Sequence, residues 1–142
     1  RTWQAGERAD DPDANCRAEE AMVRAARDAF GFTKDEAPIH RGWFRDTVGP
    51  LADRLRAAGG IALLRLDGDW YDSTVECLEA LLPVVQEEAV VIIDDYYAWD
   101  GCSRAVHDTL SRHDLAYRLW TAPRAQGAWF VKRAARPSLD VL

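Results

Sequence analysis

Four aspartates stand in two closely spaced sets in the middle of the chain. Asp67 and Asp69 come directly after a short aliphatic run that begins at Ile61, and the adjacent pair Asp94 and Asp95 follows a second such run. Short aliphatic runs of this kind are typical of buried parallel strands. Carboxylates that meet repel one another unless some take up protons or a cation neutralises them. A hard divalent ion with oxygen ligands, Mg²⁺ in the simplest case, would resolve that repulsion.

The segment between the two runs has the spacing of a helix. Its apolar residues recur every three to four positions and form one stripe: Val75, Leu78, Leu81 and Leu82. Ser73 and Glu76 fit a capping box at its start, and Pro83 fits its end. A strand, helix, strand unit brings the carboxyl ends of both strands to one edge of the sheet, where ligands of open α/β sheets bind. A single aspartate there more often caps a helix or forms a turn, but two sets on adjacent strands favour a metal site.

The rest of the chain predicts an α/β fold with a mainly parallel sheet and an antiparallel carboxyl-terminal end. We expect helices at 15–30, from Pro50 to Gly59, and at 102–112; strands at 37–41, 61–66, 89–93, 115–121 and 128–133; a loop at 42–47; and a hairpin-like connection at 122–127. The predicted domain covers residues 15–136, between a loose segment, 1–14, and a tail, 137–142.

Composition narrows the classes of function. The chain has 142 residues, which suits one domain, and its formal net charge of −6 argues against a nucleic-acid partner. No stretch is apolar and long enough to span a bilayer and no signal peptide is visible, so we expect a cytoplasmic protein without a membrane partner. Cys16, Cys77 and Cys102 lack metal-site or redox-pair spacing and are interpreted as reduced thiols.

Three motifs resemble the macrocin O-methyltransferase family, whose members are metal-dependent enzymes that use S-adenosylmethionine to methylate sugar hydroxyls on antibiotics. The motifs are Gly-Trp-Phe-Arg-Asp-Thr at 42–47, Leu-Arg-Leu-Asp-Gly-Asp-Trp-Tyr-Asp-Ser-Thr at 64–74 and Ile-Ile-Asp-Asp-Tyr at 92–96. Ala105, Val106 and Trp129 also fit, and the resemblance runs from about residue 38 to 133. The two acidic motifs at this spacing carry most of its specificity.

The resemblance implies a class I methyltransferase fold, Rossmann-like, with S-adenosylmethionine and Mg²⁺ as cofactors. It implies that Asp67, Asp94 and Asp95 are the Mg²⁺ ligands and that Asp69, beside Asp67, is the catalytic base. The remaining expected site residues are Trp43, Phe44 and Gly68 on the cofactor side, and Trp70, Tyr96, Tyr97 and Trp99 on the acceptor side. The expected partner is a glycosylated small molecule, and assembly into a homo-oligomer is left open.

The resemblance also implies a gap, because such enzymes carry two further strands upstream, with a glycine-rich loop for the cofactor. Neither is present in this sequence, which we therefore interpret as the carboxyl-terminal portion of such an enzyme. In the family's sheet those strands lie between the segment at 38–41 and the strand at 61–66. Residues 38–41 should then be detached from the main sheet.

Two other functions stay open. A phosphatase of the haloacid dehalogenase type would use Asp67 as nucleophile and Asp69 as acid, and also has a later Asp-Asp pair. Tyr71 stands where that class usually has Thr or Val, and no lysine separates the acidic sets. The alternative outside enzymes is an inactive interaction or scaffold domain. Arg65, in the middle of a predicted strand, needs a carboxylate partner if it is buried, and the sequence does not identify one.

Overall fold

The computed structural model describes residues 19–121 and 126–133. The chain divides into two compact units, Arg1–Trp43 and Phe44–Leu142, and each is described by itself. The predicted domain boundaries after residues 14 and 136 lie outside the described residues. Within the described residues, no helix combines the length and the apolar character that crossing a bilayer requires.

The first unit contains one described helix, α1, Glu20–Ala29. Arg27 is the buried residue of this helix, and Met22 is two-thirds exposed. After α1, Thr33 and Glu36 bond reciprocally: the Thr33 N–H donates to the Glu36 carboxylate over 2.9 Å and the Glu36 N–H donates to the Thr33 hydroxyl over 3.2 Å. This tight turn stabilises the chain between α1 and Trp43 without a further helix or strand.

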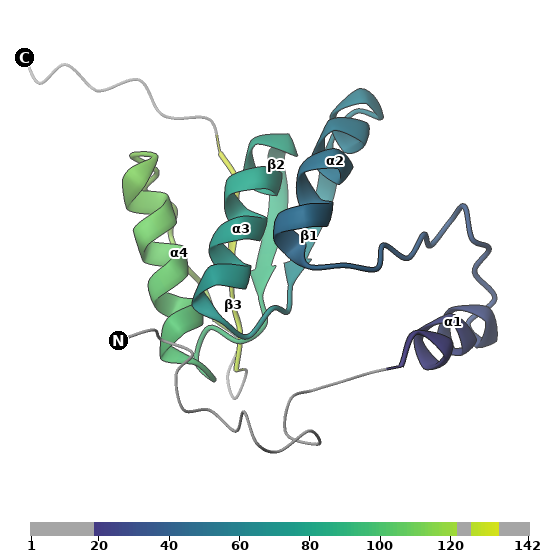
Figure 1. Cartoon of the computed structure of the whole chain (residues 1–142). Coiled ribbons are helices and arrows are strands. Elements are labelled where there is room, and N and C mark those ends of the chain that lie inside the picture. The colour runs from purple at the N-terminus through teal and green to yellow at the C-terminus, as the bar shows by residue number, and fades with distance from the viewer. Residues whose placement is uncertain (1–18, 122–125, 134–142) are drawn as a thin grey trace, which may run out of the picture. The chain divides into compact units, whose positions relative to one another are not determined.

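The second unit is built on a three-stranded sheet in the order β1-β2-β3 (Figure 1). β1, Ile61–Leu66, pairs in parallel with β2, Val85–Ile93, so that Leu66 lies beside Ile93. β3, Ala128–Val131, pairs antiparallel with the other side of β2. The predicted α/β class, with a mainly parallel sheet that ends in an antiparallel strand, is confirmed.

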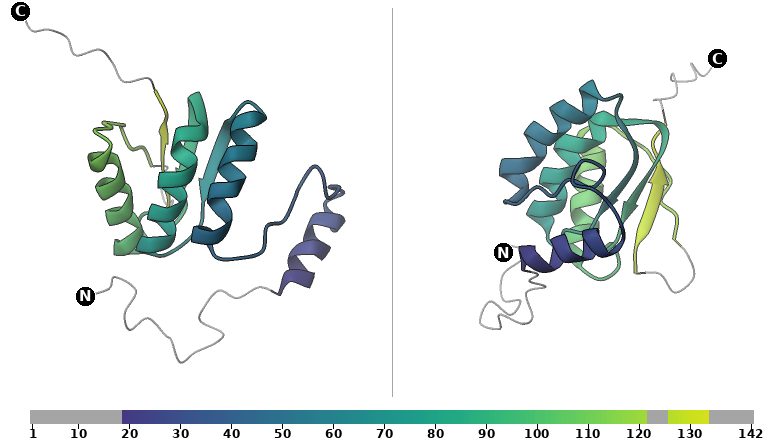
Figure 2. Two further views of the ribbon diagram at one scale, coloured as in Figure 1. Left: turned by 45° about the horizontal axis from the view of Figure 1, so that its top comes forward. Right: turned by 90° about the vertical axis from the view of Figure 1, so that its right-hand side faces the viewer.

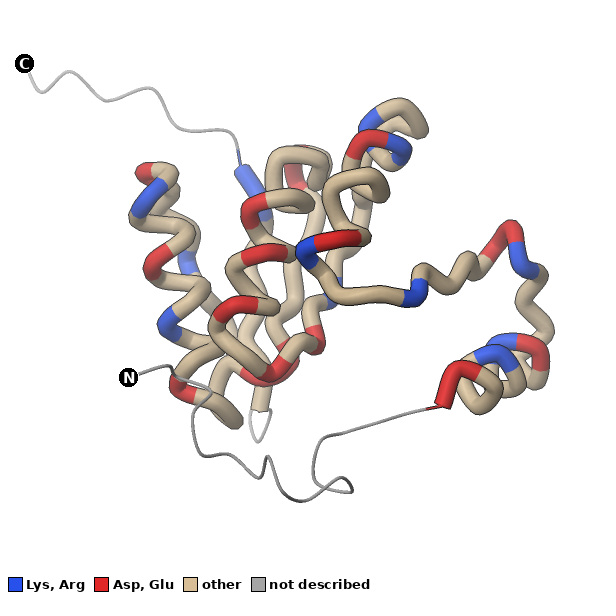
Figure 3. The backbone as a smooth tube through the Cα atoms, in the orientation of Figure 1, with Lys and Arg blue, Asp and Glu red and all other residues tan. Residues whose placement is uncertain are grey.

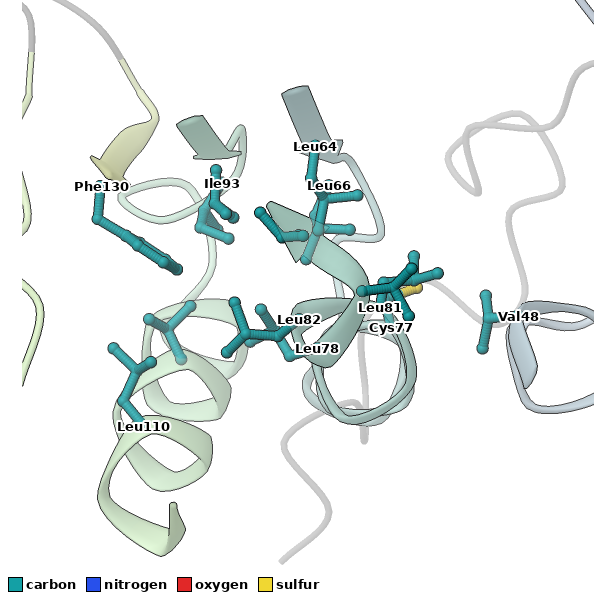
Figure 4. Close-up of a cluster of buried hydrophobic side chains, with 14 of the residues drawn as sticks. Val48, Leu64, Leu66, Cys77, Leu78, Leu81, Leu82, Ile93, Leu110 and Phe130 are labelled. Atoms are coloured by element: carbon teal, nitrogen blue, oxygen red, sulfur yellow. The ribbon is translucent and has the colours of Figure 1, made fainter. Parts of the chain in front are cut away.

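Three helices cover one face of this sheet, as the right-hand view of Figure 2 shows. They are α2, Phe44–Ala57; α3, Tyr71–Leu81, which continues into the 3₁₀ turn η2, Leu82–Val84; and α4, Asp100–Arg112. The core lies between these helices and the sheet (Figure 4). Its fully buried side chains include Leu78, Val91, Ile93, Val106 and Phe130. The buried face of α4 includes Ala105, Val106, Thr109 and Leu110.

The opposite face of the sheet is open among the described residues. Side chains alternate along a strand, so Leu64 and Leu66 are buried under the helices while Leu63 and Arg65 point the other way and are exposed. Trp129 is exposed in the same manner on β3. The aliphatic character of the strands predicts burial on both faces, and the described part of the chain covers only one of them.

Helix boundaries differ most from the sequence prediction at α2 and α3. The loop predicted at 42–47 is wrong from Phe44 onward, because α2 starts there and holds Pro50 in its interior. Proline fixes φ near the helical value, so the helix continues with the loss of one hydrogen bond. The capping box at Ser73 is also wrong, since α3 starts at Tyr71 with Trp70 as its N-cap. The predicted end near Pro83 is confirmed.

Two predicted strands are absent from the sheet. Residues 38–41 form no strand, so the strand predicted there is wrong. Their detachment from the main sheet stays a prediction. Residues 115–121 form only an isolated bridge, in which Trp120 and Trp129 exchange two hydrogen bonds of 2.8 Å. Tyr117 stacks on Phe130, and this ring packing takes the place of a regular ladder. The predicted connection at 122–127 lies mostly outside the described residues.

Candidate functional site

The carboxyl ends of β1 and β2 bring the two aspartate sets together, as the sequence predicts. Both strands run in the same direction, and acidic segments gather where β1 ends and α3 begins (Figure 3). Asp67 directly follows β1, and Asp94 and Asp95 directly follow β2. The Asp94 N–H donates to the Leu66 carbonyl over 2.9 Å, which extends the strand pairing to the site itself.

Three of these carboxylates converge closely enough to share a cation. One oxygen each from Asp67, Asp69 and Asp95 lies within 4.8 Å of the other two. Carboxylate oxygens are the donors that Mg²⁺ prefers, and the partial exposure of these side chains leaves room for the water ligands that Mg²⁺ keeps. The donor set therefore fits a hard divalent cation.

The pKa of Asp95 is raised by burial and by the neighbouring carboxylates. Burial, followed by the negative charge of Asp69, raises the pKa of the Asp95 carboxyl to about 6. The charges of Asp67 and Asp94 act in the same direction, while the Asp69 N–H, which donates to Asp95 Oδ2 over 3.3 Å, partly offsets them. A positive ion among these oxygens would reverse the repulsion.

Asp94, the aspartate outside the converging group, shares a cationic partner with Asp67. The Arg65 guanidinium bridges two aspartates, with Nη1 2.7 Å from Asp67 Oδ2 and Nη2 2.8 Å from Asp94 Oδ2. All three side chains are about half exposed. This is the carboxylate partner that the sequence did not identify for Arg65. The sequence signal was the two-residue spacing of Arg65 and Asp67, which places both on one face of an extended chain. The register adds Asp94, because Arg65 lies opposite Ile92 and Asp94 comes two residues later.

A tight turn fixes Asp69 above the end of β1. Asp69 has a φ of 55°, in the left-handed region, and the Trp70 N–H donates to the Gly68 carbonyl across it. Aspartate tolerates this conformation better than most residues. A side chain at Gly68 would press on Ser73, at 3.2 Å from its Cβ, and would touch Phe44 at 3.5 Å. The glycine therefore lets the turn pack closely against α3 and the start of α2.

Gly127, the residue before β3, lies against the end of β2 and was not singled out by the sequence. A Cβ at this position would lie 2.7 Å from the Ile93 carbonyl oxygen and 3.0 Å from that of Asp94. The backbone before β3 therefore approaches the end of β2 closely, where the acidic pair begins. The one sequence signal was a glycine directly before a short aromatic strand.

The four aromatic residues predicted for the acceptor side form two pairs. Trp70 and Trp99 have ring centroids 5.1 Å apart, and Tyr96 and Tyr97 have centroids 4.8 Å apart in an edge-to-face arrangement. Tyr97 is 60% exposed, whereas Tyr96 and Trp99 pack partly against the core. The Tyr96 hydroxyl is 2.7 Å from His107 Nε2, an interaction that the sequence did not predict.

The residues predicted on the cofactor side fall in different units. Phe44 begins α2 and lies next to Gly68, at the same edge as the aspartates. Trp43 is the last residue of the first unit and is 72% exposed. The structure thus places Phe44 and Gly68 together, and Trp43 is described only within its own unit.

Sequence comparison gives the relationships of the chain. The profile of the family described as Macrocin-O-methyltransferase (TylF) matches residues 4–131. An 8-demethyl-8-(2,3-dimethoxy-alpha-L-rhamnosyl)-tetracenomycin-C 4'-O-methyltransferase of Streptomyces olivaceus is 43% identical over 95 residues, which are 67% of this chain and 34% of that protein. A demethyldecarbamoylnovobiocin O-methyltransferase of Streptomyces niveus is 39% identical over 112 residues, which are 79% of this chain and 40% of that protein.

Structural comparison agrees. The O-methyltransferase NovP matches with a TM-score of 0.71 and 30% identity, over 82% of this chain and 46% of its own. CalS11, a TDP-rhamnose 3'-O-methyltransferase, matches in its apo form with a TM-score of 0.62 and 25% identity, over 78% of this chain and 50% of its own. The chain spans less than half the length of the curated relatives and matches their carboxyl-terminal part. This chain belongs to the macrocin O-methyltransferase family and has part of its Rossmann-like methyltransferase fold.

Proposed function

We propose that this chain supplies the metal-binding part of an enzyme that transfers a methyl group from S-adenosylmethionine to a sugar hydroxyl of a glycosylated natural product. The observation that carries the proposal is the convergence of Asp67, Asp69 and Asp95 within 4.8 Å, at the ligand-binding edge of a family member's sheet. The names of the relatives support the acceptor class, because they include a rhamnosyl-tetracenomycin and a mycinamicin 3''-O-methyltransferase.

Asp67, Asp94 and Asp95 would hold the Mg²⁺. When bound, this ion supplies a Lewis acid that makes an adjacent sugar hydroxyl more acidic. Asp67 and Asp95 already belong to the converging group, and Asp94 lies on the same sheet edge in its ion pair with Arg65. Two of the three proposed ligands thus contribute oxygens to one point without rearrangement.

Asp69 would accept the proton of the acceptor hydroxyl. Methyl transfer forms a bond between that oxygen and the methyl carbon as the bond from carbon to sulfur breaks, so the oxygen must lose its proton. The left-handed turn at Asp69 supports this role, because it aims the carboxylate into the same group of oxygens as Asp67 and Asp95. A base must lie within hydrogen-bond reach of the proton it removes, and a hydroxyl among these oxygens would satisfy this.

The aromatic pairs would position the acceptor. Trp70, Tyr96, Tyr97 and Trp99 offer flat apolar faces of the kind that contact sugar rings, and they follow directly after the two aspartate sets. Phe44 and Gly68 would face S-adenosylmethionine. A cofactor contact by Trp43, which belongs to the first unit, stays a prediction. Holding two reactants in the right orientation can lower a reaction barrier by several kcal/mol. Self-association of the chain stays a prediction.

Calorimetric titration with Mn²⁺ and Mg²⁺ tests the metal site directly. The unchanged chain should bind one ion. Asp67→Asn should lose that binding, because Asp67 is a proposed ligand and belongs to the converging group. Asp114→Asn is the matched control, since Asp114 is an exposed residue just after α4. A titration that is flat for the unchanged chain would overturn the proposed metal site.

Two activity assays on the same samples separate the proposed function from its rivals. Labelled S-adenosylmethionine with a rhamnosylated acceptor reports methyl transfer, and p-nitrophenyl phosphate reports a phosphatase. Family membership favours the first over the second. Phosphate release that requires Asp67 would instead support the phosphatase, and absence of both activities together with absence of metal binding would support the scaffold domain.

A further inference from the structure

Arg65 is a cation already present at the proposed metal site. Its guanidinium contacts one oxygen of Asp67 and one of Asp94, at 2.7 and 2.8 Å. Asp67 is a member of the converging trio, and Asp94 is the strand-end aspartate outside it. The positive charge thus contacts one carboxylate of the converging trio and one carboxylate outside it.

The strand geometry explains this position. Arg65 points to the open face of the sheet, because Leu64 and Leu66 on either side point under the helices. Asp67 lies two residues further along on the same face. Since Leu66 pairs with Ile93, the next positions along the two strands are Asp67 and Asp94, and one guanidinium can reach both.

We propose that Arg65 is a built-in competitor for the metal, which holds Asp67 and Asp94 until a divalent cation displaces it. This inference rests on the proposed metal site. The guanidinium offsets one of the two negative charges of Asp67 and Asp94, and its departure frees Asp94 to turn toward the trio. Metal binding and the Arg65 bridge therefore exclude each other.

The bridge is weak enough to be displaced. Arg65, Asp67 and Asp94 are each 45–50% exposed, and ion pairs between exposed groups contribute little to stability because water screens them. The open face of the sheet also leaves the long arginine side chain free to move into solvent. A divalent ion carries twice the charge of the guanidinium and contacts more of the carboxylates at once. It therefore displaces the guanidinium at sufficient concentration.

Removal of Arg65 should therefore tighten metal binding. Arg65→Met keeps an unbranched apolar stem of similar length and removes the positive charge. Binding of Mn²⁺ should become roughly tenfold tighter, the scale that Coulomb's law gives for losing one like charge a few ångströms from a divalent ion in a high dielectric. Arg65→Lys keeps the charge but loses the two-nitrogen fork, and its affinity should lie between the two.

The experiment measures Mn²⁺ affinity by electron paramagnetic resonance for the unchanged chain, Arg65→Met, Arg65→Lys and the control Arg56→Met. Arg56 is an exposed arginine in the last turn of α2, paired with Asp53, so its loss should leave metal affinity unchanged. Circular dichroism checks that each variant is folded. As a second readout, Mg²⁺ should shift the side-chain Nε–H resonance of Arg65 and leave that of Arg56 in place.

The outcomes separate this inference from the proposed function. Tighter binding by Arg65→Met than by the unchanged chain supports the inference. If the unchanged chain binds Mn²⁺ and Arg65→Met binds it equally or more weakly, the competitor role is wrong while the metal site stands. If no variant binds Mn²⁺, both are overturned.

Discussion

Asp95→Asn should stabilise the metal-free chain at neutral pH, although it removes a proposed ligand. Burial and the neighbouring charge of Asp69 raise the pKa of Asp95 from 3.8 to about 6. The charged carboxylate is therefore less favourable in the folded chain than in the unfolded one. Asparagine has nearly the same shape, can still accept the hydrogen bond from the Asp69 N–H, and carries no charge.

The pH window follows from the direction of the shift. Between pH 3.8 and about 6 the unfolded chain releases the Asp95 proton while the folded chain retains it, so stability falls as pH rises. Below this window Asp95 is neutral in both states, and the variant should gain nothing. Above the window the gain should be constant.

The magnitude follows from the pKa shift and the exposure of the site. One pKa unit corresponds to about 1.4 kcal/mol, so a fully buried group with this shift would lose about 3 kcal/mol. Asp95 is only partly buried and water screens its charges, which reduces the expected gain for Asp95→Asn to about 1 kcal/mol. The variant thus measures the cost of holding a charged Asp95 beside a charged Asp69.

The assay is urea unfolding in a chelator at intervals from pH 4 to pH 8. The transition midpoint of Asp95→Asn should exceed that of the unchanged chain above pH 6, and the difference should shrink as the pH falls to 4, with equal slopes. Asp114→Asn should show no such pH-dependent difference. A variant that is less stable at pH 7.5, or whose gain is the same at every pH, would refute the electrostatic reasoning. Added Mg²⁺ should stabilise the unchanged chain and have little effect on Asp95→Asn.

Two further predictions concern packing. Gly127→Ala should destabilise the chain by about 1–3 kcal/mol in urea unfolding, because its Cβ would meet the backbone of Ile93 and Asp94. Gly49→Ala is the control, because its Cβ meets nothing within 4 Å. Equal effects of the two variants on stability would contradict the close approach at Gly127. Cys77 should resist iodoacetamide at pH 8 in the folded chain and react after unfolding, because burial, and then the charge of Glu76, raises its pKa to about 12. Rapid labelling of native Cys77 in a mass spectrum would contradict this.

The elements with strong local patterns were predictable from sequence. The aliphatic run at Ile61–Leu66 is β1, and the apolar stripe that includes Leu78 and Leu81 is buried in α3. The weaker patterns were not. Pro50 suggested a helix start, yet α2 accommodates it in its interior because the surrounding residues pack on α3. Residues 115–121 have strand-like composition, yet they form only an isolated bridge, and Tyr117 of this segment stacks on Phe130.

The candidate site divides in the same way. The chain sequence by itself determined that acidic residues follow two strands joined by a helix. Because strands joined in this way are parallel and end at one edge of the sheet, it also determined that the two aspartate sets lie at the same edge. The tertiary structure alone decided which carboxylates meet. The left-handed turn at Asp69 brings that residue into the group, and the parallel register places Asp94 within reach of Arg65. Side-chain direction depends on strand register and turn conformation, and neither is written in the spacing of residues along a chain.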